Sequence, residues 1–393
     1  MKGVIRMVLE VKSVDVYKTL MESAKRIGQA AEAESVQADL NSTISENIIN
    51  LIREEGINKL ILPKRFGGPQ IDFTTFADMV KEVGYYNLSA AWITYFFSLH
   101  NAWVAYLPEH RQKEIVQSGG LLADIFAPIG KLEKVDGGFI ISARYNFVSG
   151  IKYAGWVGVG ALHQSEGSDK KTMHGFVINT KELEIVENWN SLGLRGSGSH
   201  TIIVDNVFVP DDMVIDLGAM AANRKPNLKD YDEDYLYYNA PFHPAFFVGF
   251  PAMAIGAAER VLDEFKKATK GRVRMNGEQE VASPRSQRVL ATLTLKLQSA
   301  KSLMKTYIEM LENNEGVHPS EFKAIRAEII QNCVDISVKT ILTLGAFALV
   351  KGNPVEMITR DLIAIGTHVT SLYEDAVEAY GKHLFDYPSP VMG

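Results

Sequence analysis

An apolar stretch of this sequence carries the side chains best suited to proton chemistry. Residues 90–107 read A-A-W-I-T-Y-F-F-S-L-H-N-A-W-V-A-Y-L, and their spacing predicts a helix over 90–117 that is apolar nearly all round and therefore buried. Polar side chains recur within it: Trp92, Tyr95, Ser98, His100 and Asn101. Unpaired buried polar groups cost free energy, so this helix lines a core or a pocket. His100 either exchanges a proton with a ligand or is a core histidine whose nitrogens the protein satisfies.

Two further segments combine small polar residues with a strand. Residues 189–210 begin with a Gly/Ser-rich run around Arg195 and continue as alternating β-branched residues that Pro210 ends. The glycines let the backbone adopt positive φ and let another chain or a ligand approach closely. Residues 145–150, Y-N-F-V-S-G, are typical of a strand end and place the hydroxyl of Ser149 there. Both segments are also compatible with ordinary turns that bind nothing.

The elements that must position these residues change type twice along the chain. Helical periodicity extends to about residue 118, short β-rich runs separated by turns follow to about 214, and a tyrosine-rich link covers 215–240. Helices are expected again near 245–270, 283–313, 319–350 and 354–382. We therefore predict three domains: a helical domain at 1–118, a β domain at 119–240 and a helical bundle at 241–393.

Composition restricts the class of protein. The chain has 393 residues, 46% of them hydrophobic and 22% charged, with a net charge of −6, which argues against a nucleic-acid partner or a membrane surface. The longest nearly apolar run, Ala245 to Ala258, contains Gly and Pro and is too short to span a bilayer. The single Cys333 suits a reducing compartment, so a cytoplasmic location is expected. Neither a metal-ligand spacing nor a nicotinamide-binding G-x-G-x-x-G motif is found in the sequence.

One long motif resembles a known family. The run L-G-L-R-G-S-x-S-x-x-x-x-V-D-x-V-F-V-P at 192–210 is similar to the signature of the acyl-CoA dehydrogenase superfamily. The resemblance implies an α+β multidomain fold: an N-terminal all-α domain, a middle β-barrel or sandwich that covers one side of a flavin, and a C-terminal four-helix bundle. It also implies a homotetramer.

The position of the catalytic base separates the branches of this superfamily. Dehydrogenases use a glutamate to remove the α-proton of an acyl thioester, and the two positions where they carry it hold Val369 and Lys270 here. Proton abstraction from carbon needs a positioned base, so the usual desaturation is not expected. The pair Arg360-Asp361 followed by His368 instead resembles the two-component, reduced-flavin-dependent monooxygenases, in particular the phenol hydroxylases of bacterial steroid degradation. Four further motifs agree: L-H-N at 99–101, A-P-x-G at 127–130, V-D-G-G-F at 135–139 and G-x-H-x-F at 381–385.

The resemblance implies a chemistry and a set of roles. A separate NAD(P)H:flavin reductase would supply reduced FMN, or FAD, and O2 would add to the flavin to give a hydroperoxide that hydroxylates an aromatic, phenolic molecule. The expected catalytic residues are Ser149 and His368 beside the flavin and His100 near the phenol hydroxyl. The remaining expected contacts are Trp92, Phe147 and Val148 with the flavin ring, Arg272 and Arg274 with its phosphate, and Tyr95 and Ser98 with the substrate.

Two other functions remain open from the sequence. The first is an acyl-CoA dehydrogenase with an atypical catalytic base. The second is a flavin-binding member of the fold that has lost its chemistry. Arg272 and Arg274 could likewise belong to a solvated basic turn, and His368 could be an ordinary core histidine.

Overall fold

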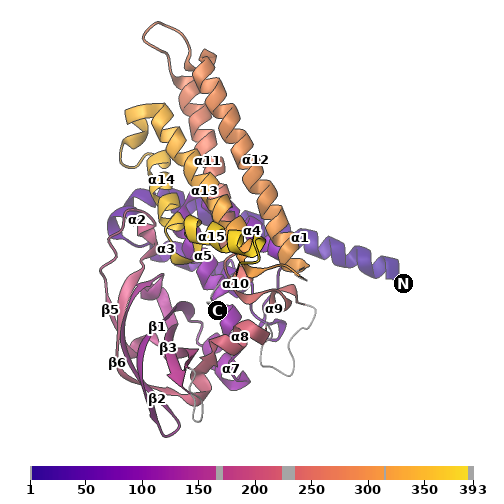
Figure 1. Ribbon diagram of the computed structural model, residues 1–393, viewed down its shortest axis with the longest axis vertical. Coiled ribbons are helices and arrows are strands. Elements are labelled where there is room, and N and C mark those ends of the chain that lie inside the picture. Colours follow the sequence, from indigo (N-terminus) through magenta and orange to yellow (C-terminus); the bar gives the residue numbers. More distant parts are fainter. Residues whose placement is uncertain (1, 165–170, 224–234, 314–315, 388–393) are drawn as a thin grey trace.

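The computed structural model describes residues 2–164, 171–223, 235–313 and 316–387, in three regions along the chain (Figure 1). The first region is helical. Its α-helices are α1 (Lys2–Ala33), α2 (Ser35–Asn41), α3 (Glu46–Glu54), α4 (Phe73–Tyr86), α5 (Leu88–Leu99), α6 (Asn101–Val104) and α7 (Glu109–Gln117). Apolar side chains of α1 and α3 at helical spacing, among them Ile27 and Ile48, are fully buried.

The predicted helix at 90–117 is wrong in one respect, because it is three helices, α5, α6 and α7. The first break lies at His100, where the amide of Asn101 donates to the carbonyls of Phe97, Ser98 and Asn58 and competes with the backbone ladder. Pro108, which has no N–H to continue a helix, precedes α7. His100 is therefore at a junction between two helices instead of inside one.

The middle region is a mixed sheet of seven strands in the order β5-β6-β2-β1-β3-β4-β7. The strands are β1 (Leu121–Val135), β2 (Gly138–Val148), β3 (Ala154–Gln164), β4 (Lys171–Asn179), β5 (Glu184–Val186), β6 (His200–Pro210) and β7 (Val214–Asp216). The first part of β1 pairs in parallel with β3 and its last part pairs antiparallel with β2. The rings of Phe139 on β2 and Phe176 on β4 are 5.4 Å apart although two strands separate them in the sheet, so the two halves curl around a common core.

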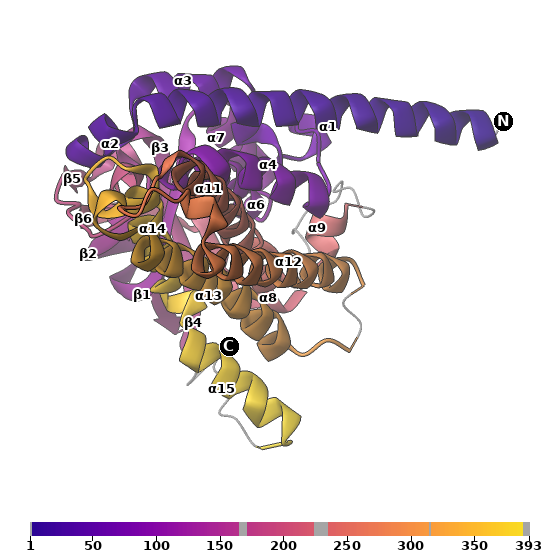
Figure 2. The same ribbon diagram turned by 90° about the horizontal axis from the view of Figure 1, so that it is seen from above.

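The third region is again helical. Its α-helices are α8 (Leu217–Asn223), α9 (Leu236–Asn239), α10 (Phe242–Phe246), α11 (Gly249–Gly271), α12 (Pro284–Glu312), α13 (Pro319–Leu344), α14 (Pro354–Gly366) and α15 (Tyr373–Leu384). The long helices α11, α12 and α13 pack side by side (Figures 1 and 2). Part of the predicted 215–240 link, 224–234, lies outside the described residues.

The predicted last helix at 354–382 is two helices, α14 and α15, which are separated by a turn. Thr367 donates to the carbonyl of Ala364, and the ring of His368 accepts from the N–H of Thr370 at 3.3 Å. These side-chain bonds replace the backbone ladder, and the β-branched residues around His368 also disfavour a helix. The turn holds His368 at the junction with the rest of the molecule.

Two helical segments are long and apolar enough to cross a membrane, but both belong to the bundle. In the segment Phe242–Gly271, 83% of the most apolar 18-residue window is buried inside the protein, which identifies it as a core helix, as the sequence predicted for 245–258. In the segment Pro319–Leu349, 39% of the corresponding window is buried. Its remaining apolar face includes the exposed side chains Leu342, Phe347 and Leu349.

The loop between β5 and β6 joins all three regions. Gly193 lies against α14 so closely that a Cβ atom there would be 2.0 Å from the carbonyl oxygen of Arg360. The next residue, Leu194, donates its N–H to the buried carboxyl of Asp361 at 2.6 Å. Arg195 donates to the carbonyl of Asp39 on α2 at 2.8 Å, and Arg360 reaches the Asp39 carboxylate at 3.0 Å.

Gly193→Ala should destabilise the protein by about 1–3 kcal/mol, because the added methyl group has no room beside the backbone of α14. The free energy of unfolding in urea measures this. The matched control is Gly381→Ala in α15, where a Cβ meets nothing within 4 Å and the helix should gain stability. Equal stability of both variants would contradict the close contact.

Asp361 predicts a pH dependence of stability. Burial raises the pKa of this carboxyl to about 7, although the Leu194 N–H and Arg360 oppose the rise. The folded state therefore binds a proton that the unfolded state releases, and the contribution to stability falls as pH rises from about 4 to about 7. Asp361→Asn keeps an acceptor for Leu194 without ionising.

The variant should therefore be more stable than the wild type at about pH 8, with the advantage vanishing near about pH 4. Urea unfolding at several pH values measures this, with the exposed Asp205 changed to Asn as the control. A constant difference between Asp361→Asn and the wild type across this range would show that Asp361 is ionised throughout.

Candidate active site

A line of hydroxyl groups connects α5 with the β domain. The Trp92 Nε1–H donates to Ser149 Oγ at 2.9 Å, Ser149 Oγ is 2.8 Å from Ser199 Oγ, and Ser199 Oγ is 2.7 Å from Ser197 Oγ. A serine hydroxyl has one proton and two acceptor lone pairs. If Ser199 donates to Ser149, both lone pairs of Ser149 are filled and its own proton remains free for a ligand.

The end of β2 directs alternate side chains in opposite directions. A register shift between Tyr145 and Val148 in the pairing with β6 marks a bulge, and Phe147 within it has a φ of 69°. Val148 is completely buried, whereas Phe147 is 67% exposed and its ring lies 6.1 Å from that of Trp189. The bulge therefore presents an aromatic pair at the surface, two residues before the hydroxyl of Ser149.

His368 faces the same end of α5 from the turn between α14 and α15. Its ring is 5.7 Å from that of Trp92 and meets the ring of Phe250 edge to face at 5.0 Å. Burial, followed by the charge of Arg326, lowers the pKa of His368 to about 4, so the imidazole is neutral at physiological pH. Because Nδ1 accepts the Thr370 N–H, the single proton is assigned to Nε2, which can donate it to a ligand.

Arg326 on α13 is a site residue that the sequence reasoning missed. It is 4% exposed, donates to the carbonyl of Thr370, and lies 4.8 Å from the ring centre of Phe247. No carboxylate in the described ranges pairs with it. A signal was present, because Arg326 is one helical turn from Phe322 and Ile330 on the buried face of an otherwise apolar stripe.

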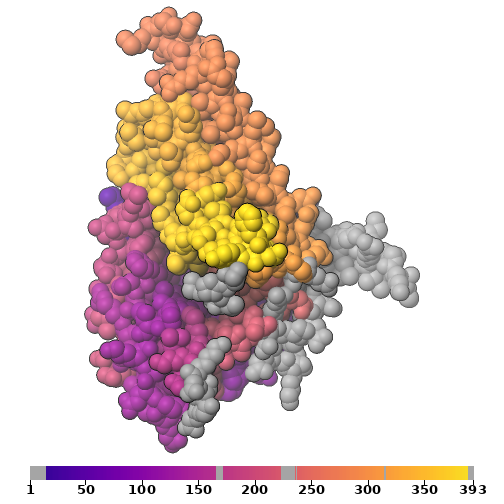
Figure 3. Space-filling model, viewed as in Figure 1, coloured from indigo at the N-terminus to yellow at the C-terminus, as the bar shows by residue number. Residues whose placement is uncertain are grey.

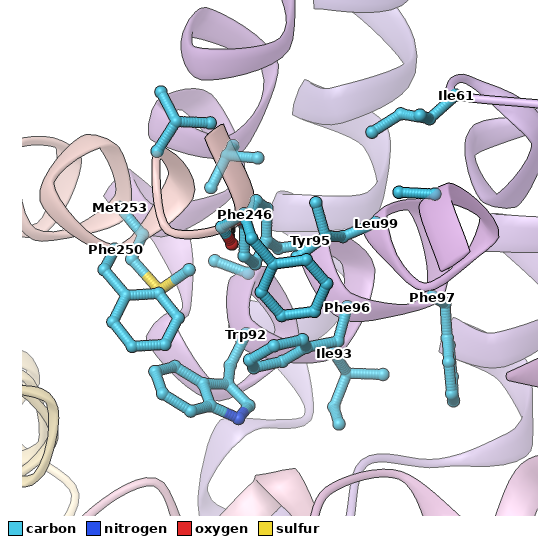
Figure 4. Close-up of a cluster of buried hydrophobic side chains, with 14 of the residues drawn as sticks. Ile61, Trp92, Ile93, Tyr95, Phe96, Phe97, Leu99, Phe246, Phe250 and Met253 are labelled. Carbon is cyan, nitrogen blue, oxygen red and sulfur yellow. Dashed lines mark hydrogen bonds between the residues drawn. The ribbon is translucent and has the colours of Figure 1, made fainter. Parts of the chain in front are cut away.

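His100 lies farther along the same face of α5. The rings of Trp92 and Phe96 are 5.0 Å apart, and the rings of Phe246 and Phe250 lie close to them (Figure 4). The ring of His100 is 5.0 Å from that of Phe96 and 6.2 Å from that of Phe246. The Nδ1–H of His100 donates to the carbonyl of Leu122 on β1 at 2.7 Å. Its other nitrogen faces Asp124, which the sequence reasoning also missed.

Tyr95 and Ser98 project into the core and use their hydroxyls there. Tyr95 donates to the carbonyl of Phe246 at 2.5 Å, and Ser98 donates to that of Ile57 at 2.7 Å. Neither side chain is exposed at all. Their expected role in substrate binding stays a prediction, and any such contact would involve their apolar parts.

Arg272 and Arg274 are far from these residues within one chain. They follow α11, whose other end contacts Trp92 through Phe250, and a helix of that length extends about 35 Å. The connection from α11 to α12 forms the tip of the molecule, away from the strands (Figures 1 and 3). An open pocket of about 310 Å³ there is lined by Arg272, Arg274, Arg285 and Glu280, among others.

Within this pocket the two arginines are not equivalent. Arg274 pairs with Glu280 at 2.9 Å and donates to Ser283 at 2.6 Å, and it holds the pKa of Glu280 down at about 2. Among the described residues, the guanidinium of Arg272 makes a single long hydrogen bond, of 3.3 Å, to the carbonyl of Leu344. Arg272 is therefore the more available of the two for an anionic ligand.

Comparison with known proteins gives one family and many whole-chain relatives. Residues 248–371 match the family described as acyl-CoA dehydrogenase, C-terminal domain. The oxygenase component of p-hydroxyphenylacetate 3-hydroxylase from Acinetobacter baumannii is 24% identical over 395 residues, covering 98% of this chain and 92% of that protein. The oxygenase subunit HsaA, a flavin-dependent monooxygenase of Rhodococcus jostii, is 25% identical over 356 residues, covering 88% and 92%.

A solved structure shows the same fold. XiaF from Streptomyces sp., in complex with FADH2 and glycerol, superimposes with a TM-score of 0.88 at 16% identity, covering 98% of this chain and 99% of that one. The predicted fold class is thus confirmed, with the helical, β and helical regions in the predicted order. Residues 248–371 match the acyl-CoA dehydrogenase C-terminal domain family, and the chain as a whole has the acyl-CoA dehydrogenase fold and is similar over most of its length to flavin-dependent oxygenase components.

Proposed function

We propose that this protein is the oxygenase component of a two-component monooxygenase, which uses reduced flavin and O2 to hydroxylate an aromatic, phenolic small molecule. The observation that carries the proposal is the placement of two neutral donors, Ser149 and the Nε2–H of His368, around Trp92 at the edge of an aromatic enclosure. Neither donor brings a charge that would attract water into the site.

The residues present fit a flavin ring. Ser149 has a hydroxyl proton available when Trp92 and Ser199 fill its lone pairs, and the exposed Phe147–Trp189 pair offers an apolar surface beside it. Reduced flavin, either FMN or FAD, supplies the electrons that activate O2 when it is bound.

Within the site, Ser149 and His368 would hold protons in place, while Trp92, Phe96 and Phe250 would exclude water from the reacting atoms. His100 would take or share the hydroxyl proton of the substrate, because a phenolate is the better nucleophile. A dehydrogenase is disfavoured because the positions of its glutamate hold Val369 and Lys270, both exposed and neither a carboxylate.

A separate reductase would deliver the reduced flavin. The name "oxygenase component" of the Acinetobacter relative implies that a second component works with it. The present sequence carries no nicotinamide-binding motif of its own. We infer a cytoplasmic location, which suits the free, buried Cys333.

We also infer a homotetramer in which the arginine pocket serves the flavin of a neighbouring subunit. The distance along α11 separates Arg272 from the aromatic site of its own chain. The bundle further exposes large apolar side chains that a partner could cover: Leu295, Leu342, Phe347, Leu349 and Val350.

Changing His368 to Ala should uncouple oxygen consumption from hydroxylation, because a donor and an aromatic wall of the site are lost together. With a flavin reductase and a panel of phenols, we expect product formed per O2 consumed to fall about tenfold or more, with hydrogen peroxide released instead. The exposed His110 changed to Ala is the control. If an acyl-CoA instead reduces the bound oxidised flavin of the wild type, the protein is a dehydrogenase.

Changing Arg272 to Ala should weaken flavin binding about tenfold, the effect of one lost charge-assisted contact with a phosphate. Fluorescence titration with FMN and FAD measures the affinity, and light scattering measures the oligomeric state in parallel. The exposed Arg288, which is outside the lining of the pocket, provides the matched Arg288→Ala control. Unchanged affinity of the Arg272 variant for both flavins would exclude this phosphate contact.

A further inference from the structure

Three polar atoms meet below α5 without satisfied hydrogen bonds. His100 Nε2, Asp124 Oδ2 and Trp103 Nε1 are buried and make no hydrogen bond of good geometry in the described part of the chain, although the Trp103 N–H is close enough to Asp124 to lower the pKa of its carboxyl. His100 Nε2 and Asp124 Oδ2 are 3.3 Å apart. Buried polar groups of native proteins are nearly always paired, so a cluster of three requires an explanation. A shared proton and a bound ligand together provide one.

The proton count of this cluster follows from the second nitrogen of His100. Nδ1 is bonded to the carbonyl of Leu122, which accepts only, so Nδ1 carries a hydrogen. If Nε2 were unprotonated and Asp124 ionised, two acceptors would face each other at 3.3 Å. One proton must therefore lie between them, on His100 or on Asp124. Burial raises the pKa of Asp124, with His100 and Trp103 opposing the rise, which makes a neutral carboxyl accessible.

Asp124 can reach a ligand as well as His100. Its side chain keeps 13% of its surface accessible, compared with 2% for His100. On β1 it lies two residues after Leu122, so both project to the same face of the strand, towards α5. The ring of His100 in turn lies tilted against Phe96 at 5.0 Å and stacks on Phe246 at 6.2 Å, and both rings form part of the aromatic enclosure.

We propose that Asp124 is a substrate-binding residue: together with His100 it holds one shared proton and recognises the ring hydroxyl of the aromatic substrate. This inference rests on the proposed function and names the group that selects a phenol. The pair offers both a donor and an acceptor, which a hydroxyl matches and an ether does not. When the phenol ionises, its O–H bond breaks, the electron pair stays on the phenol oxygen, and the proton goes to the free acceptor of the pair.

The groups around Asp124 confine the proton exchange to the substrate, His100 and Asp124. The titratable groups that face Asp124 are His100, at the α5–α6 junction, and the buried Tyr95, on α5, whose own pKa burial holds well above its usual range. After the His100–Asp124 pair has taken the proton of the phenol, it carries one positive charge beside the negative phenolate. The net charge of the enclosure is therefore unchanged. A substrate without a hydroxyl would leave the pair unmatched, which is costly in a buried site.

The test compares 4-nitrophenol with 4-nitroanisole, its methyl ether, in which a methyl group replaces the hydroxyl proton. Calorimetry measures the affinity of the full-length protein for each, with and without oxidised flavin. We expect the wild type to prefer the phenol by about tenfold or more, and Asp124→Asn, which cannot release or take up a proton, to lose most of this preference. The control is Asp216→Asn, which alters a surface aspartate 3.9 Å from His174.

Equal affinity of the wild type for both probes, or an unchanged preference in Asp124→Asn, would overturn the proposal. The wild-type comparison alone decides it if the variant does not fold. Because binding needs neither O2 nor a reductant, its result is separate from that of turnover. A preserved preference without hydroxylation would overturn the proposed function and leave this inference standing.

Discussion

The close packing of Gly193 against α14 is the contact on which the arrangement of the three regions depends. At this point the backbone of the β domain touches that of the bundle, and neighbouring residues bind α2 through Arg195 and Asp39. Only glycine allows two backbones to approach so closely. Because Asp361 accepts from Leu194 within the same contact, the loop is held by a directional bond as well as by packing.

The contact between the Gly193 loop and α14 also sets the geometry of the site. The loop that binds α14 through Leu194 continues directly into Ser197 and Ser199, which support Ser149. On the other side, α14 leads directly into the turn that holds His368. A displacement of the loop relative to α14 would therefore separate the two donors from each other, since each is tied to one partner of the contact.

The charge of His368 is controlled by burial instead of by ion pairing. His368 is kept neutral by its apolar surroundings and by the nearby cation of Arg326, which no carboxylate in the described ranges neutralises. His100 and Asp124 share a single proton between Nε2 of the imidazole and Oδ2 of the carboxyl. Neutral groups that can still donate are suited to reactive oxygen chemistry, in which water must be excluded while protons remain available.

The sequence by itself determined the order of helical and β regions, because periodicities of 3.6 and 2 residues are local properties of the chain. It also indicated Ser149, His100 and His368, through a specific motif and through polar residues in an apolar stretch. Only the tertiary structure decided which of these residues meet. Trp92 and Ser149 are far apart in sequence, but their side chains form a direct hydrogen bond. Arg272, in contrast, follows one end of α11, whereas Trp92 contacts the other end of that helix. Asp124 and Arg326 escaped notice because an isolated charged residue gains meaning only from its burial, and burial depends on contacts between distant segments of the chain.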